Sequence, residues 1–126
     1  MGAPVVHFEI GAANGDRSRR FYADLFGWTV TPFPGGEDYG VVDTGSGTGI
    51  GGGIMQAPEG MQPWVTVYVG VDDLEKSLSR AEELGARRVM GPAPVGDMGE
   101  IAMFADPDGN ILGLFAATRE ATPAEQ

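Results

Sequence analysis

The sequence predicts an α+β fold of two βαβββ modules that form curved mixed sheets around a cleft. Residues 5–30 have the pattern of an alternating strand, a capped helix that ends at a glycine, and a second strand. Residues 63–89 repeat this plan about 58 residues later. Several short strand candidates and no further helical pattern follow each copy. We therefore expect one domain over residues 1–126, with an internal repeat of residues 4–56 and 63–117.

The first strand and the first helix each have two distinct faces. Alternation along residues 5–10 puts three apolar side chains on one strand face and His7 and Glu9 on the other. Asn14 is a typical N-cap residue, and Gly27 favours the left-handed conformation that ends a helix. The spacing between them predicts an inward helix stripe, which comprises Ser18, Phe21, Tyr22, Leu25 and Phe26.

The second helix has its own start and stop signals. Asp72 and Glu75 have the spacing of a capping box, and Gly85 stands where Gly27 stood in the first copy. Its predicted inward stripe comprises Leu74, Leu78, Ala81 and Leu84. Because one helix covers one face of each sheet, we expect the opposite faces to line the cleft. Alternation directs six residues into it, namely His7, Glu9, Thr66, Tyr68, Gly113 and Phe115.

Two loops have strong composition signals. Residues 45–53 (GSGTGIGGG) lack the Lys-Ser/Thr ending of a phosphate-binding loop, and no helical pattern follows them. They therefore favour a glycine-rich hairpin over a phosphate site. Residues 106–110 (DPDGN) predict a tight turn before a last strand at residues 111–116.

Composition excludes several classes of function. The chain has no cysteine, so disulfides, thiolate metal sites and cysteine nucleophiles are excluded. Its net charge of −10 argues against nucleic-acid binding, which needs a basic face. No apolar run approaches the length of a membrane span and no signal peptide pattern is present, so we expect a cytoplasmic protein without a membrane partner.

These elements together resemble the vicinal oxygen chelate superfamily, which holds glyoxalases, ring-cleaving dioxygenases and bleomycin-resistance proteins. The resemblance covers nearly all of residues 4–117. Four segments carry it: VVHFEI in the first strand, RRFYADLFGW at the first helix, VDDLEKSLSRAEELGA at the second helix, and FADPDGNILGL at the last hairpin. It implies the glyoxalase/bleomycin-resistance fold.

The resemblance also implies one divalent metal, held by histidine and glutamate from strands of both repeats. The family's first-strand histidine falls on His7, but its second-repeat histidine falls on Thr66 and its last-strand glutamate falls on Gly113. A further ligand position falls within residues 49–55, which contain no histidine, carboxylate or amide. A divalent metal with open positions needs about three protein ligands. We therefore expect no metal and no other cofactor, and a divalent metal at His7 and Glu9 is the alternative that we do not favour.

The function that the resemblance implies is metal-free binding of a small organic molecule, as in bleomycin-resistance-like proteins, to sequester an antibiotic or metabolite. The alternative is a lyase, isomerase or dioxygenase of the same superfamily, with His7 and Glu9 as catalytic residues and with or without a divalent metal. We also expect a homodimer, because a second copy would cover exposed sheet edges. The residues expected to bind the ligand are His7, Glu9, Trp28, Tyr39, Thr66, Tyr68, Gly113 and Phe115.

Overall fold

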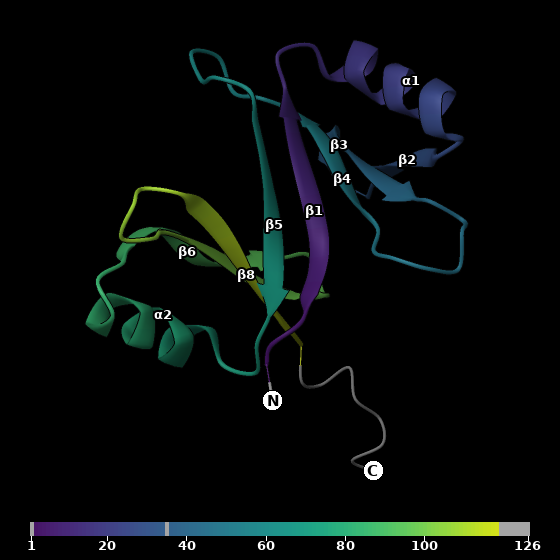
Figure 1. Cartoon of the computed structure of the whole chain (residues 1–126). Coiled ribbons are helices and arrows are strands. Elements are labelled where there is room, and N and C mark those ends of the chain that lie inside the picture. The colour runs from purple at the N-terminus through teal and green to yellow at the C-terminus, as the bar shows by residue number, and fades with distance from the viewer. Residues whose placement is uncertain (1, 35, 119–126) are drawn as a thin grey trace. The chain divides into compact units, whose positions relative to one another are not determined.

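The computed structural model describes residues 2–34 and 36–118, with only the backbone at positions 36 and 37. Both halves of the chain have the element order β-α-β-β-β, which confirms the predicted α+β fold class (Figure 1). The first half comprises β1 (Val5–Ala12), α1 (Gly15–Phe26), β2 (Thr29–Phe33), β3 (Gly36–Asp43) and β4 (Gly52–Gln56). The second half comprises β5 (Trp64–Gly70), α2 (Leu74–Glu83), β6 (Arg87–Val95), β7 (Gly99–Ala105) and β8 (Ile111–Ala117).

The chain divides into two compact units. Residues 6–67 form one unit, and residues 2–5 with residues 68–118 form the other. We call them the first and the second unit. The division falls inside β5, so its first four residues belong to the first unit.

In the first unit the strands lie in the order β2-β3-β4-β1. β1 runs parallel to β4, while β3 is antiparallel to both β2 and β4. The glycine-rich loop at residues 44–51 joins β3 to β4, which confirms the predicted hairpin. The buried apolar residues of this unit include Ala12, Val42, Ile54 and Ala57, each at most 7% exposed.

Helix α1 begins and ends where its sequence predicts. The Asn14 side chain accepts a hydrogen bond from the backbone N–H of Arg17, and Gly27 has φ 73°. Most of the predicted inward stripe is wrong, however, because Phe21, Leu25 and Phe26 are each 55–57% exposed.

The side chain of Arg19 explains this difference. Its guanidinium donates to the carbonyl of Ile54 at 3.1 Å and to the Asp16 carboxylate at 2.7 Å, and only 19% of the side chain is exposed. An apolar-periodicity pattern assigns an arginine to the outer face of a helix. Here Arg19 faces the sheet, because its guanidinium donates to a strand carbonyl. Helix α1 is therefore rotated about its axis relative to the prediction, and the apolar side chains of Phe21, Leu25 and Phe26 face outward.

In the second unit the strands lie in the order β5-β8-β7-β6. Helix α2 packs Leu74 and Leu78 against Ala102 and Leu114, which together form the core of this unit. The N-cap is Asp73, whose side chain accepts from the backbone N–H of residue 76, so the predicted cap at Asp72 is one residue too early.

The second unit also tests two finer predictions. Leu84, the last member of the predicted α2 stripe, lies beyond the helix end and is 62% exposed. The tight turn at residues 106–110 is confirmed, since the Asp106 carboxylate accepts from the backbone N–H groups of Asp108 and Asn110. Neither described helix is long and apolar enough to cross a membrane.

Candidate functional site

The two faces of β1 have different surroundings. Phe8 packs on the ring of Trp28, at 5.4 Å between centroids, and Trp28 in turn stacks on Tyr22 of α1. This is the helix-facing side of the sheet. His7 and Glu9 alternate with Phe8 and therefore lie on the opposite side, as the sequence predicts. Trp28, which we expected among the ligand-binding residues, packs on the helix side. Its contact with a ligand stays a prediction.

Tyr39 of β3 reaches His7 and Glu9 across the intervening strand β4. Its hydroxyl oxygen lies 2.9 Å from Nε2 of His7 and donates to Oε1 of Glu9 at 3.3 Å. The phenol and imidazole rings are nearly parallel, at 16°. Gly53 pairs with Glu9 on one side, and the Tyr39 ring lies directly over it. The absence of a side chain at Gly53 is what opens this path.

Trp64 of β5 is the fourth residue of this group. Its indole Nε1–H donates to Oε2 of Glu9 at 3.1 Å. Its ring lies over Gly11, which has no side chain to block this position. Glu9 is only 5% exposed, and each of its carboxylate oxygens accepts a hydrogen bond. We call His7, Glu9, Tyr39 and Trp64 the strand-face cluster, and all four belong to the first unit.

The donor and acceptor roles in the strand-face cluster follow from chemistry. An ionised carboxylate only accepts hydrogen bonds, so the Tyr39 hydroxyl uses its one proton toward Glu9. The same hydroxyl must then accept from His7, which places a proton on Nε2 of the imidazole. The cluster is therefore an ordered chain from His7 through Tyr39 to Glu9.

Burial controls the charge of His7. It lowers the pKa of the imidazole below its ordinary value of 6.5, and the nearby Glu9 carboxylate opposes this effect only in part. His7 is therefore neutral at pH 7, with Nε2 protonated. A neutral imidazole can take up a proton as well as donate a hydrogen bond, so this residue has the chemistry of either a binding group or a base.

The other predicted site residues lie elsewhere. Thr66 belongs to the first unit and is 8% exposed, whereas Tyr68, Gly113 and Phe115 belong to the second. Tyr68 pairs with Gly113 across β5 and β8, and an added Cβ at Gly113 would lie 2.4 Å from the Tyr68 ring. The Tyr68 ring therefore occupies the space that a side chain at Gly113 would need. A contact of these residues with a ligand stays a prediction.

The sequence pattern did not predict the hydrogen bond from Trp64 to Glu9. The signal that could have found it is the position of the strand glycines. Gly11 follows His7 and Glu9 on the same face of β1, and Gly53 lies beside Glu9 on β4. A glycine within a strand marks a place where another group approaches closely, and here the two groups are the rings of Trp64 and Tyr39.

The glyoxalase-like domain family matches residues 6–115. The chain belongs to this family. The glyoxalase-like chain is 32% identical over 107 residues to CFP32 of Mycobacterium tuberculosis, a protein named as a glyoxylase, and this match covers 81% of the chain and 41% of CFP32. It is 34% identical, over an alignment of 131 residues, to the anthracycline biosynthesis protein DnrV of Streptomyces peucetius, covering 90% of the chain and 46% of DnrV. The glyoxalase-like chain thus spans less than half the length of these curated relatives.

Solved structures share its fold. A glyoxalase/bleomycin resistance protein/dioxygenase superfamily member from Vibrio splendidus superposes with a TM-score of 0.62 at 17% identity, covering 93% of this chain and all of that one. This likeness, together with the family match, places the glyoxalase-like chain in the vicinal oxygen chelate superfamily.

The divalent metal that this superfamily implies does not fit the donor set of the described residues. Among the side chains of residues 2–34 and 38–118, no three from histidine, cysteine, aspartate or glutamate gather where they could hold an ion. The imidazole of His7 and both oxygens of Glu9 are engaged with Tyr39 and Trp64. A catalytic divalent ion usually has three protein ligands, and this cluster offers one imidazole and one carboxylate.

Proposed function

We propose that this protein binds a small organic molecule without a metal, and that the strand-face cluster supplies the polar contacts. The observation that carries the proposal is the hydrogen-bonded chain from His7 through Tyr39 to Glu9. It occupies the strand face on which the superfamily's first metal ligand falls, and the groups that donate to Glu9 there are a phenol and an indole N–H. The fixed tautomer of His7 gives the site a defined hydrogen-bonding direction.

The rings of the strand-face cluster favour an aromatic ligand. Tyr39 and Trp64 are each only partly buried, and both rings flank the carboxylate of Glu9. Small-molecule sites typically combine such aromatic walls with a few fixed polar groups. The relative DnrV is named for anthracycline biosynthesis, which supports an anthracycline, a flat polycyclic quinone, as the first probe.

Calorimetric titration with an anthracycline tests the proposal. We expect binding that is unchanged by a strong chelator and about tenfold weaker in Tyr39→Phe, since ~1.4 kcal/mol is a factor of ten and a hydrogen bond is worth about that much. Ser77→Ala is the control, because it removes a hydroxyl from α2 in the second unit. Binding that disappears with chelator, or that is equal in all variants, would refute the proposal.

A metal-free lyase or isomerase is the second candidate. The observation that favours it is the neutral, half-buried His7 linked to Glu9 through Tyr39, since this chain could stabilise a proton taken up by the imidazole. Because CFP32 is named as a glyoxylase, the test reaction is conversion of the methylglyoxal–glutathione adduct. The binding proposal predicts no turnover with or without added metal. Turnover that is lost in His7→Gln would establish the enzyme instead.

A further inference from the structure

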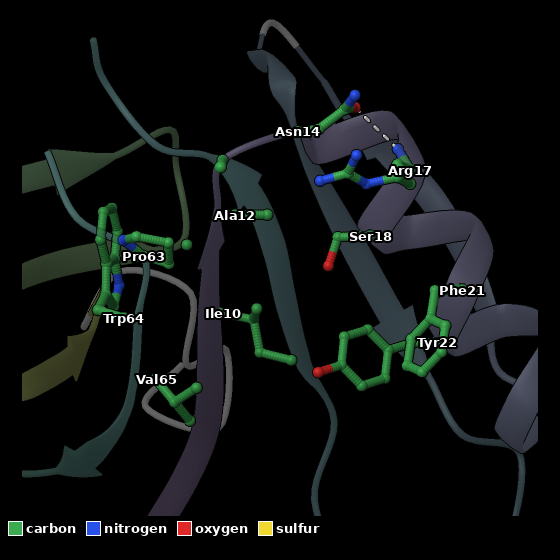
Figure 2. A pocket seen from close by; sticks show the side chains of 12 residues that line it. Ile10, Ala12, Asn14, Arg17, Ser18, Phe21, Tyr22, Pro63, Trp64 and Val65 are labelled. Atoms are coloured by element: carbon green, nitrogen blue, oxygen red, sulfur yellow. Dashed lines mark hydrogen bonds between the residues drawn. The ribbon is translucent and has the colours of Figure 1, made fainter. Parts of the chain in front are cut away.

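A hollow of about 560 Å³ lies on the other side of the sheet, within the first unit. Figure 2 shows it between β1 and α1, with the side chains of Ile10 and Ala12 extending from the strand toward the helix. Its size falls within the range of about 300–1,000 Å³ that small-molecule sites have. The hollow also reaches Pro63, Trp64 and Val65, so it shares Trp64 with the strand-face cluster (Figure 2). His7, Glu9 and Tyr39 do not line it, and His7 and Glu9 face the opposite side of β1.

Its lining combines a broad apolar wall with hydroxyl groups. Ile10 of β1 faces Tyr22 of α1, and Phe21 extends the apolar wall along the helix (Figure 2). The hydroxyls of Ser18 and Tyr22 point into the space between the helix and the strand. The β1 side and the α1 side of the hollow are therefore both suited to a flat apolar molecule that carries a few polar atoms.

Arg17 adds a positive charge at one end of the hollow, next to Asn14 (Figure 2). Arg19 pairs with Asp16, Arg80 pairs with Glu83, and Arg88 pairs with two glutamates of α2. Among the described arginines without an ion pair, Arg17 is the one that lines the hollow. In the described part of the chain the guanidinium of Arg17 makes no ion pair and no side-chain hydrogen bond. A cation left available beside an apolar hollow, in a protein of net charge −10, favours an anionic group at this end.

We propose that the hollow binds an aromatic anion, with the ring system between Ile10 and Tyr22 and the carboxylate or sulfonate at Arg17. The guanidinium and the Asn14 amide are both able to donate to such a group, and charge-assisted hydrogen bonds of this kind are the stronger ones. This inference does not depend on the function proposed for the strand-face cluster.

Two fluorescent probes with the same ring skeleton test the inference. One is 1-anilinonaphthalene-8-sulfonate, and the other is N-phenyl-1-naphthylamine, which lacks the sulfonate. The wild-type protein should bind the sulfonate more tightly. Arg17→Gln should weaken sulfonate binding about fivefold, the upper range for a solvent-accessible ion pair, and leave the uncharged probe unaffected. Arg20→Gln is the matched control, because it removes a charge from the same helix outside the hollow.

A second variant tests the cavity itself. Ser18→Phe places a ring in the hollow and should abolish binding of both probes, while circular dichroism reports whether α1 is intact. Tyr39→Phe should leave probe binding unchanged, because the hydrogen-bonded chain of His7, Tyr39 and Glu9 does not line the hollow. Equal sulfonate affinity in Arg17→Gln, Arg20→Gln and wild type would overturn the inference. So would a wild-type dimer that excludes both probes, because a second copy would then fill the hollow.

Discussion

A Cβ atom on Gly53 would lie 2.1 Å from the hydroxyl oxygen of Tyr39. Contacts this short do not occur, so any side chain at position 53 must displace the phenol from His7 and Glu9. We expect Gly53→Ala to lower the free energy of unfolding by about 1–3 kcal/mol, the usual cost of an overpacked site. Urea denaturation followed by circular dichroism measures it.

A double-mutant cycle identifies the cause of this cost. In a Tyr39→Ala background the ring is absent, so Gly53→Ala should cost close to zero. If the glycine substitution cost the same with and without the Tyr39 ring, the loss would come from the backbone of β4 and not from the strand-face cluster.

Removing only the Tyr39 hydroxyl should also destabilise the first unit. Tyr39→Phe keeps the ring over Gly53 but takes one hydrogen-bond donor from the buried Glu9 carboxylate. We expect a loss of about 1–2 kcal/mol in the free energy of unfolding, because the buried carboxylate then has one hydrogen-bond donor fewer. Tyr22→Phe, on the helix side, should cost less in the same denaturation experiment, and a larger loss in Tyr22→Phe would contradict the assignment.

The lowered pKa of His7 predicts a pH dependence with a definite sign. In the unfolded chain the imidazole protonates near pH 6.5, whereas burial lowers its pKa in the folded state. Between these two pH values the unfolded state binds more protons, so the free energy of unfolding falls as the pH falls. The contribution is present in full above the unfolded pKa and is lost as the pH drops from about 6.5 to the folded pKa.

His7 is the only histidine of the chain, which makes this prediction direct to measure. The single imidazole signal in a proton NMR titration should have its midpoint below 6.5. In His7→Gln the free energy of unfolding should vary less between pH 7.5 and 5.5 than in wild type. A midpoint above 6.5 would mean that the Glu9 carboxylate outweighs burial, and the slope would then have the opposite sign.

Metal content follows from the donor set. With one imidazole and one carboxylate at the cluster, both already hydrogen-bonded, we expect well under one equivalent of zinc, nickel, iron or manganese in protein purified without chelator. Elemental analysis of wild type and His7→Ala measures it. A stoichiometric metal that is absent from the His7→Ala protein would contradict this prediction.

Exposed side chains at the C-terminal end of α1 favour the homodimer expected from the sequence. Leu25 and Phe26 are 57% and 55% exposed, and apolar groups that gather on a surface commonly mark a protein interface. Light scattering should give twice the chain mass of 13.2 kDa, and Leu25→Glu should shift it toward the monomer. Leu84→Glu, at a similarly exposed leucine of the second unit, is the control. A wild-type monomer at all concentrations would refute the dimer.

Local patterns in the sequence predicted the order of the elements and the face of β1 that carries His7 and Glu9. Strand alternation, the Asn14 cap and the Gly27 stop each depend on neighbouring residues only, and the structure keeps all three. The rotation of α1 could not be predicted in this way. It depends on Arg19 satisfying the carbonyl of Ile54, which lies 35 residues further along the chain.

The composition of the site was harder to predict than its location. His7 and Glu9 are neighbours on one strand, but their partners Tyr39 and Trp64 come from β3 and β5. Tyr39 was expected among the ligand-binding residues, not as the hydroxyl that joins His7 to Glu9. The rings of Trp64 and Tyr39 reach Glu9 because Gly11 and Gly53 have no side chains. Which residues lie beside these glycines depends on the strand register, which one sequence does not define.

The positions of the two tryptophans make intrinsic fluorescence a probe of unfolding in one unit of the protein. Trp28 and Trp64 are the only indoles of the chain, and both lie in the first unit, on opposite faces of its sheet. Intrinsic fluorescence therefore records the melting of one half of the molecule, whereas far-ultraviolet circular dichroism records both. If the two signals change at the same denaturant concentration, the halves unfold as a single cooperative body.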